Sequence, residues 1–598
     1  MKAVLVVLAG LLVYCLPTQL QATVKPASVV YTIPSNGSWD IITQSAIAVR
    51  FSKDLTEADF QSVRINVSGD VSAVQHGSVV LSDDQRTVIF KPDVPFAEGE
   101  KVTVTVVSSE DGLQMLAALY IFSFTVAKGD RMLSVAEMMH FEMPKQVENL
   151  HKTAVDILGG ETIEPVVKVF SKGEPAPGKI FLSCFSQDST KNYLFILNND
   201  GTPVFAQHHS KNCFDFKVQP TGQLSYYDIQ YTNFAVMDSG YHIRDRIAAG
   251  PGLFTDIHEL RLLPNHHALL IGTLGRQKDM SKLVAKGDSK AFLVEFVLQE
   301  LDSSKNIVFE FRSWEHYNVL STTQPLTDTL IDYIHPNAIE LDSDGNILIS
   351  CRHLEEITKV SRTTGEVMWR WGGKHDDFRW DDTLHFSHQH GIRRLSGGNL
   401  ILFDNGNVIH PGFSRAVEYT MDESKKTVRK AWEYRNSPDF YSVAMGDVQR
   451  LQNGNTFIGW GLIWDSTQTA SEIDAAGKKI MEVVLPPGCH SYRCYRFDWN
   501  PSVGAGVASK AATPAPAGLS SYPNPGSTIM HIAYETKQTS SSRLVVRDIL
   551  GHMMTTVDAG RMGSGMHELQ INCSNWPAGI YLFGLEGSNS WQRMTIVR

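Results

Sequence analysis

Short runs of alternating apolar and polar positions fill the region from residue 25 to residue 126. Two such runs cover residues 47–51 and 102–106, and the cluster Ser82-Asp-Asp-Gln85, Pro92 and Gly99 mark turns among them. Period-two alternation punctuated by turn residues is typical of half-buried strands. The pattern predicts a small β-sandwich over residues 25–126.

A longer pattern repeats between residues 165 and 500. Each unit has an apolar strand, a turn rich in Gly and Asn, a second strand, and a further strand pair around another turn. The first turns are Pro220–Leu224, Pro264–Leu269, Asp342–Ile347, Ser396–Leu400 and Gln452–Thr456. About six four-stranded units fit, with irregular spacing that indicates loop insertions. We therefore expect an all-β chain with a six-bladed β-propeller over residues 165–500. A tandem of irregular β-sandwiches is the alternative.

The remaining segments divide into a leader, two connecting stretches and a third module. Residues 1–22 carry Lys2, an apolar run and a small-residue end, the pattern of a cleaved secretory signal peptide. Residues 127–164 read as a partly helical linker, and the Pro- and Ala-rich residues 501–521 read as a flexible one. Residues 522–598 again show strand patterns, so a second small β-sandwich is expected there.

Composition narrows the class of protein. The 598 residues carry a net charge of -10 without a basic stripe, which argues against a nucleic-acid binder. After the leader, no apolar stretch is long enough to cross a bilayer. Six cysteines lie beyond the leader, too few for a disulfide framework in a chain of this size. Whether Cys489 and Cys494 form a disulfide stays open.

Three units place a histidine at the same position, ten to twelve residues before the end of the first turn. These are His258, His335 and His390, and the strand that carries each is expected to be the innermost one, lining the central channel. Three converging imidazoles suit either a zinc ion with an open position or the binding and transfer of an anion. Arg352, at the end of the next strand after His335, favours the anion. Zinc-binding histidines are usually held in place by a carboxylate. Apart from Glu259, we find no carboxylate directly beside these histidines in the sequence, and this weakens the zinc interpretation.

The motifs of the repeat region resemble those of bacterial aryl-sulfate sulfotransferases. The resemblance rests on His335-Pro-Asn337, Ser350-Cys-Arg-His353, Ser387-His-Gln-His-Gly391, Leu402-Phe-Asp-Asn-Gly406 and Ser491-Tyr-Arg-Cys-Tyr-Arg496. It implies a six-bladed propeller that moves a sulfuryl group from a phenolic sulfate donor to a phenol acceptor, without nucleotide cofactor or metal. The nucleophile of such an enzyme falls on His390, in a ping-pong reaction through a sulfohistidine.

The same resemblance assigns the other site residues. His258, His335 and Arg352 are expected to be catalytic, with the division of roles among them left open. Apart from the resemblance, Asn337, Asn405 and Arg496 are candidates for substrate contacts, and Asn405 either orients a group in the channel or holds a turn. The aromatic residues Tyr231, Trp460 and Tyr495 belong either to the propeller core or to an aryl-binding mouth.

The outer modules resemble two further families. Residues 25–126 resemble bacterial immunoglobulin-like domains. Tyr522-Pro-Asn-Pro525, Val545–Gly551 and Pro577-Ala-Gly-Ile-Tyr581 resemble the C-terminal sorting domain of the type IX secretion system. The resemblance implies passage through the periplasm, the type IX machinery as a partner, and a mature protein secreted or held at the cell surface.

Two other functions remain as alternatives at this point. One is a zinc-dependent propeller lyase or hydrolase that uses the three channel histidines as ligands. The other is a non-catalytic surface protein that binds glycans or partner proteins, which leaves the repeated histidines unexplained.

Overall fold

The computed structural model describes residues 28–109, 116–128, 165–381, 383–463 and 468–499, together with 519–522, 528–536, 540–548, 553–562, 565–577, 579–585 and 591–596. The expected signal peptide, and nearly all of both expected linkers, lie outside these residues. The chain divides into two compact units, Met1–Gly504 and Ala505–Arg598. Among the described helices, none has the length and apolar character needed to span a membrane.

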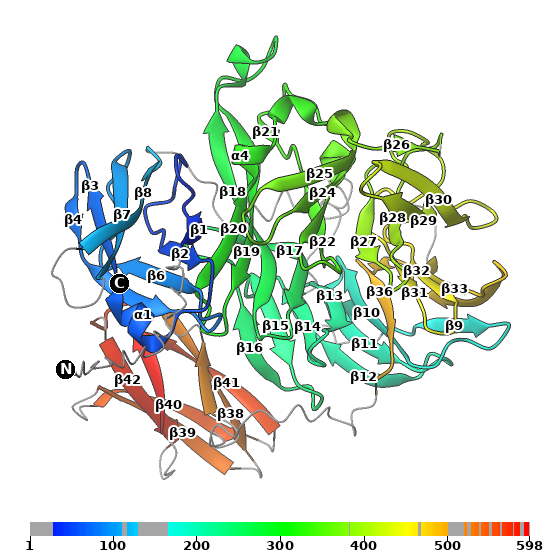
Figure 1. Cartoon of the computed structure of the whole chain (residues 1–598). Coiled ribbons are helices and arrows are strands. Elements are labelled where there is room, and N and C mark those ends of the chain that lie inside the picture. The colour runs from blue at the N-terminus through cyan, green and yellow to red at the C-terminus, as the bar shows by residue number, and fades with distance from the viewer. Residues whose placement is uncertain are drawn as a thin grey trace, which may run out of the picture. The chain divides into compact units, whose positions relative to one another are not determined.

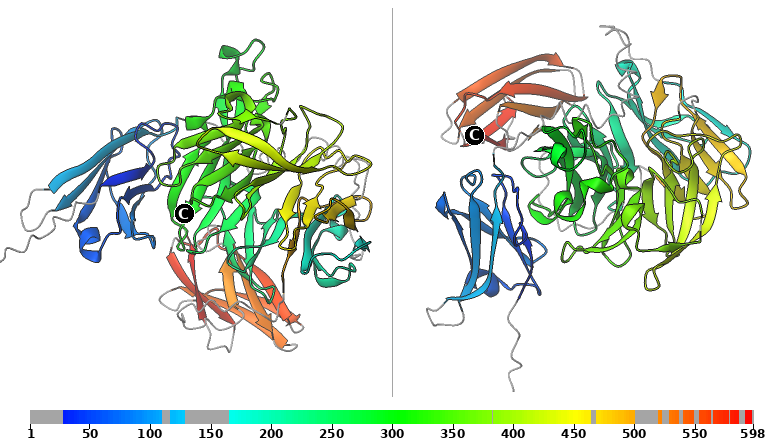
Figure 2. Two further views of the ribbon diagram at one scale, coloured as in Figure 1. Left: turned by 45° about the vertical axis from the view of Figure 1, so that its right-hand side comes forward. Right: turned by 90° about the horizontal axis from the view of Figure 1, so that it is seen from above.

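The first module is a β-sandwich of two four-stranded sheets (Figure 2, blue). Its sheets run β1 (Val29–Ile33), β2 (Ile47–Phe51), β6 (Thr87–Pro92), β5 (Gly77–Leu81), and β4 (Ala73–Gln75), β3 (Val63–Gly69), β7 (Lys101–Ser109), β8 (Leu116–Thr125). The inward positions of the two sheets form one buried core that includes Ile47, Val49 and Phe51. A short helix, α1 (Glu57–Ser62), begins at a capping box made by Thr56 and Asp59.

Residues 165–499, as far as they are described, form six sheets of four main antiparallel strands, the blades of a propeller (Figure 1). From the inner strand outward, blade 1 is β35 (Cys489–His490) and β36 (Cys494–Phe497), β10 (Lys179–Ser186), β11 (Tyr193–Leu197) and β12 (Pro203–His208); blade 2 is β13 (Cys213–Val218), β14 (Leu224–Asp228), β15 (Asn233–Met237) and β16 (Ile243–Ile247); blade 3 is β17 (Phe254–Leu262), β18 (Ala268–Lys278), β19 (Ala291–Leu301) and β20 (Ile307–Arg312). Blade 4 is β22 (Pro336–Leu341), β23 (Ile347–Cys351), β24 (Glu356–Val360) and β25 (Val367–Gly372); blade 5 is β27 (His390–Arg394), β28 (Leu400–Asp404), β29 (Arg415–Asp422) and β30 (Thr427–Tyr434); blade 6 is β31 (Asp447–Arg450), β32 (Thr456–Gly459), β33 (Gln468–Ile473) and β34 (Lys479–Val484). The prediction of a six-bladed propeller is confirmed.

Short elements decorate the blades. Three small strands extend the sheets: β9 (Lys168–Ser171) pairs with β34, β21 (Leu330–Ile331) with β19, and β26 (Arg379–Trp380) with β30. The helical turns are η1 (Ser189–Lys191), η2 (Met280–Lys282), α4 (Ser313–His316), η3 (Val319–Ser321), η4 (Arg352–Leu354) and η5 (Gly373–His375). The chain after β21 leads to His335, and η4 contains Arg352 and His353.

The ring is closed by strands from both ends of the repeat region. β36 pairs with β10, so that the last strand of the propeller completes its first blade, and β9 adds to the outer edge of blade 6. Arg496 fixes this closure: its guanidinium donates to the Ala176 carbonyl and to Asn199 Oδ1, both at 2.8 Å, and pairs with Glu472 at 3.0 Å. The closing strand therefore supplies the inner strand of blade 1, and β9 covers the outer edge of blade 6.

A buried network of charges lies among the inner strands. Glu259 of β17 contacts Lys217 of β13, Arg393 of β27 at 2.9 Å and Arg493 at 3.1 Å. Arg493 also contacts Asp215 at 2.9 Å and donates to the Asn337 carbonyl at 2.6 Å. All of these contacts join different blades, so the network ties the inner strands together across the ring.

The described cysteines, Cys184, Cys213, Cys351, Cys489, Cys494 and Cys573, are buried free thiols. Cys489 and Cys494 are therefore not bonded to each other here. Cys489 instead packs in one buried cluster with Cys184 of β10.

The second unit is a β-sandwich as well. In its described part, one sheet runs β37 (Leu519–Tyr522), β38 (Ile529–Thr536), β41 (Gly565–Asn572), and the other β40 (Met553–Met562), β39 (Ser540–Asp548), β42 (Gly579–Leu585), β43 (Trp591–Ile596). A buried core that includes Met530, Val546 and Phe583 joins them. β37 begins within the segment 501–521 that the sequence assigns to a linker. The flanking β-sandwiches agree with the predicted fold class.

Candidate active site

The three histidines lie on the innermost strands of successive blades. His258 is in β17, His335 directly precedes β22, and His390 opens β27. The rings of His258 and His335 are 4.8 Å apart, centroid to centroid. The structure thus brings the repeat-equivalent histidines together on neighbouring inner strands.

Irregular backbone at these strands aims the side chains. The pairing register shifts within β17, at the start of β22 and within β27. His335 has φ 53°, in the left-handed region, and so has Met445, with φ 68°, just before the inner strand of blade 6. Such bulges and strained residues re-aim side chains and concentrate at functional sites.

His390 is buried, and its proton is placed by Asn405. The Asn405 amide nitrogen donates to the carbonyls of Ser442 and Met445, so its Oδ1 faces His390 Nδ1 at 2.7 Å. An amide oxygen only accepts, so Nδ1 carries the proton. Nε2 therefore holds the lone pair, and it accepts the backbone N–H of Met445 at 3.2 Å.

The surroundings keep this ring neutral. Burial lowers the pKa of His390 well below its usual value, and the nearby Arg352, His335 and His258 add to the effect. A neutral imidazole with a fixed tautomer is the form that attacks an electrophile.

Arg352 enters the cluster from η4, where its backbone N–H donates to the His335 carbonyl at 3.0 Å. One Nη1–H donates to His353 Nε2 at 2.6 Å, and Nη2 donates to the Val443 carbonyl at 3.1 Å and to Asn407 Oδ1 at 3.3 Å. Its buried Nε has no hydrogen-bond partner among the described residues. Burial lowers the pKa of Arg352 to about 10, so the guanidinium is still charged near neutral pH.

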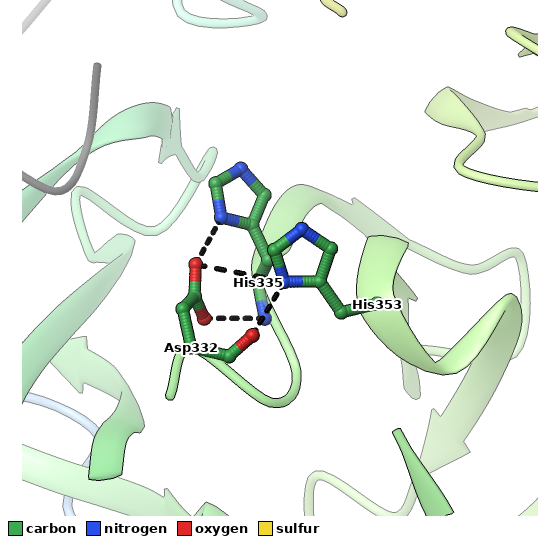
Figure 3. A group of neighbouring side chains, drawn as sticks. All are labelled: Asp332, His335 and His353. Atoms are coloured by element: carbon green, nitrogen blue, oxygen red, sulfur yellow. Dashed lines mark hydrogen bonds and ion pairs between the residues drawn. The ribbon is translucent and has the colours of Figure 1, made fainter. Parts of the chain in front are cut away.

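Asp332 holds two rings at once (Figure 3). Its carboxylate accepts from His335 Nδ1 and, at 3.1 Å, from the His335 backbone N–H. Its backbone carbonyl accepts from His353 Nδ1 at 2.5 Å. The rings of His335 and His353 lie 4.7 Å apart.

His258 has a carboxylate partner of its own. Asp256 Oδ1 lies 2.8 Å from His258 Nδ1, and the ring of Tyr492 lies 5.7 Å from that of His258. The sequence argument that Glu259 is the adjoining carboxylate is wrong: Asp256 and Asp332 contact the histidines, whereas Glu259 contacts cations.

The three expected substrate contacts have different surroundings. The side-chain amide of Asn405 forms hydrogen bonds with His390 and with the carbonyls of Ser442 and Met445, so Asn405 positions His390. Asn337 is buried beside the cluster; its Nδ2 donates to the Gln389 carbonyl at 2.7 Å, and its Oδ1 has no hydrogen-bond partner in the described chain. Arg496 belongs to the ring closure, and these contacts disagree with a substrate-binding role.

The aromatic residues considered for an aryl-binding mouth sit in other settings. Trp460 is buried and donates to Ser471 Oγ at 2.9 Å. Tyr495 is buried and donates to Asp215 Oδ1 at 2.9 Å, and Arg246 stacks over Tyr231 at 4.0 Å. These contacts fit the propeller-core interpretation.

One group of ligand-type side chains stands out among the described residues. Asp332, His335 and His353 each offer one ligand atom, and these three atoms lie within 4.8 Å of one another. This set differs from the three channel histidines of the zinc hypothesis. The Nδ1 atoms of His335 and His353 both donate to Asp332, and Arg352 donates to His353 Nε2. These ligand atoms therefore already have hydrogen-bond partners, and one of the partners is a cation.

Sequence reasoning missed three members of the cluster. The motifs contain His353 and His388 but no repeat pattern in the sequence singles them out, and Asp332 lies outside every motif. His353 follows Arg352 directly and Asp332 precedes His335 by three residues, so local spacing carried a signal for both. His388 lies 5.6 Å from the His353 ring, and burial lowers its pKa to about 3.

These features define a class of protein: a six-bladed propeller with buried imidazoles and a guanidinium gathered on its inner strands. The arylsulfotransferase family model matches residues 183–496, more than half of the chain, and the chain therefore belongs to that family. Residues 23–126 match the bacterial Ig-like domain, and residues 520–598 match the secretion system C-terminal sorting domain.

Individual relatives are more distant. The arylsulfate sulfotransferase AssT of Escherichia coli O6:H1 is 30% identical over 172 residues, which cover 22% of this chain and 28% of that protein. A solved protein of unknown function from Bacteroides caccae is 13% identical, covers 53% of this chain and 98% of its own, and has a TM-score of 0.33. A virginiamycin B lyase from Staphylococcus aureus is 9% identical, with 62% and 96% covered and a TM-score of 0.30.

Proposed function

We propose that this protein transfers a sulfuryl group from an aryl sulfate ester to a phenol, through a sulfohistidine on His390. Membership of the arylsulfotransferase family supports the reaction class. The observation that carries the proposal is the fixed tautomer of His390, whose Nδ1 proton is held by Asn405 and whose Nε2 keeps its lone pair. No nucleotide cofactor or metal takes part in the proposed steps.

In the first half-reaction, His390 Nε2 attacks sulfur, the S–O bond to the aryl group breaks, and a phenolate leaves. Arg352 and His258 face the negative oxygens of the transferring group, and such preorganised donors are worth several kcal/mol in a shielded site. Asp256 Oδ1 accepts from His258 Nδ1 and so holds the ring in orientation.

His335 is assigned the proton transfers. It starts the cycle as an imidazolium, whose Nε2 proton passes to the departing phenolate. The neutral ring then accepts the proton of the incoming phenol at Nε2 as that oxygen attacks sulfur. Its side chain is 17% exposed, the most open of the three, whereas that of His258 is 6% exposed. The S–N bond breaks in the second half-reaction and its electron pair returns to Nε2, so the kinetics are ping-pong.

The match of residues 520–598 to a sorting domain supports secretion. We propose the type IX machinery as the export partner, removal of residues 1–22 on the way, and a location outside the cell or at its surface.

Release of nitrophenol from 4-nitrophenyl sulfate, with phenol as acceptor, tests the activity. We expect acceptor-dependent turnover in the wild type, its loss in His390→Ala, and its retention in His242→Ala, a histidine in an exposed turn of blade 2. Mass spectrometry without acceptor should find one sulfuryl group on the peptide containing His390. Unchanged turnover in His390→Ala, or activity that tracks bound zinc, would contradict the proposal. The zinc-enzyme and binding-protein alternatives predict no sulfuryl transfer at all.

A further inference from the structure

Asp332 lies between blades 3 and 4, where no motif of the repeat placed a functional residue. It follows β21, which pairs with β19 of blade 3, and it precedes the histidine that opens the inner strand of blade 4. We infer that Asp332 is a positioning residue that makes His335 the proton carrier through its carboxylate, and that orients Arg352 through its carbonyl and His353. This inference rests on the proposed function.

The carboxylate branch fixes the chemistry of His335. Because an ionised carboxylate only accepts, the Nδ1 of His335 carries a proton and Nε2 is the atom that exchanges one with a phenol. The second oxygen of Asp332 accepts the His335 backbone N–H and so supports its left-handed φ of 53°. The carboxylate also stabilises the imidazolium that forms when His335 takes a proton.

The partner of each ring distinguishes the proton carrier from the nucleophile. His335 has the carboxylate of Asp332, whereas His390 has the neutral amide of Asn405. A carboxylate favours the protonated ring, and a neutral amide leaves the ring a good nucleophile and, once sulfated, a good leaving group. Burial lowers the pKa of His335, and Asp332 opposes this effect.

The carbonyl branch reaches the guanidinium. A backbone carbonyl only accepts, so His353 Nδ1 carries a proton, and an arginine only donates, so His353 Nε2 accepts from Arg352 Nη1. Burial lowers the pKa of His353 well below its usual value, which keeps the ring neutral beside the cation. His353 thus passes the position of Asp332 on to Arg352, whose charge faces the sulfuryl oxygens in the proposed reaction.

The two branches act at different points of the reaction. Proton delivery to the leaving phenolate matters most when the phenol is a weak acid. The hold on Arg352 matters for every donor, because the sulfuryl group is common to all. Loss of one branch should therefore depend on the leaving group and loss of the other should not.

Single-turnover release of phenol from two donors separates these roles. The donors are 4-nitrophenyl sulfate, whose phenol is the stronger acid, and 4-methylphenyl sulfate, whose phenol has a pKa of about 10, near that of tyrosine. Asp332→Asn should slow the 4-methylphenyl donor by about 100-fold, the low end of general acid catalysis. The 4-nitrophenyl donor should slow by only a few-fold, and Asp332→Glu should recover part of the lost rate.

Three comparison variants complete the experiment. His335→Gln should reproduce the leaving-group selectivity of Asp332→Asn, which keeps the test valid if Asp332→Asn folds poorly. His353→Gln should slow both donors by the same factor. Asp238→Asn removes a carboxylate beside His242, on a surface turn of blade 2, and should leave both rates unchanged.

The outcomes separate the inference from the function on which it rests. A wild type inactive on both donors overturns the proposed function. An active wild type with an Asp332→Asn variant that slows both donors equally, or neither, overturns the positioning role alone. One equivalent of metal in the active wild type, lost in Asp332→Asn, also overturns it, because the carboxylate is then a metal ligand.

Discussion

The sharpest test of the nucleophile assignment is the replacement of Asn405 by alanine. Asn405 Oδ1 accepts from His390 Nδ1 at 2.7 Å, and in the transition state this ring gains positive charge as Nε2 binds sulfur. A neutral hydrogen bond contributes about 1 kcal/mol, and one to a charged group about 1.5–3 kcal/mol. The barrier should therefore rise by about 0.5–2 kcal/mol, a slowing of sulfation of about 2- to 30-fold, since about 1.4 kcal/mol is tenfold.

One contact that survives the change keeps the effect below that of removing His390. The His388 carbonyl lies 3.2 Å from Nδ1 and still accepts its proton. The measurement is the nitrophenol burst from 4-nitrophenyl sulfate without acceptor, with Asn399→Ala, in a turn of the same blade, as control. An unchanged burst rate, or a change in KM alone, would refute the reasoning.

Three further outcomes follow from burial and charge. Because burial and the nearby Arg352 lower the pKa of His390, the burst rate should persist below pH 6.5; an acid limb centred at 6.5 or above would contradict this. Glu259→Gln leaves three cations short of a buried partner and should lower the free energy of unfolding by about 3–5 kcal/mol in denaturant titrations, against less than about 0.5 kcal/mol for the exposed Glu366→Gln. Burial lowers the pKa of His209 and of His316 to about 4, so the unfolded chain binds protons first and stability should fall as the pH drops from 6.5 towards 4; replacing both by Gln should flatten that slope, and an unaltered slope would count against it.

The sequence predicted the parts of this fold that depend on residues close together in the chain. The turn of each repeat fixes where its strands begin, so the inner-strand positions of His258, His335 and His390 followed from counting back from a turn. The alternation of apolar residues in the two outer modules likewise predicted their sandwiches. The immediate neighbours of these histidines did not follow.

What the sequence did not reveal depends on contacts between blades. Asn405 reaches His390 across a gap of fifteen residues, and its orientation is set by carbonyls of the next blade. Arg496 has the residue type of an anion-binding side chain, yet two of its partners, Ala176 and Asn199, lie some three hundred residues earlier in the chain, where the ring closes. Chemistry-bearing residue types were visible in the sequence, whereas their partners required the closed ring.

The closing strand has a consequence for how the chain is made. Until β36 exists, β10 has an unpaired inner edge, and exposed edges invite pairing with other chains. The same stretch brings Arg493, without which Glu259, Asp215 and the Asn337 carbonyl lose a buried partner. A nascent chain that stops before residue 489 thus lacks both the last seam of the ring and part of its internal charge balance. The final strand lies just ahead of residues 520–598, so a chain that extends through the sorting domain already contains every strand of the ring.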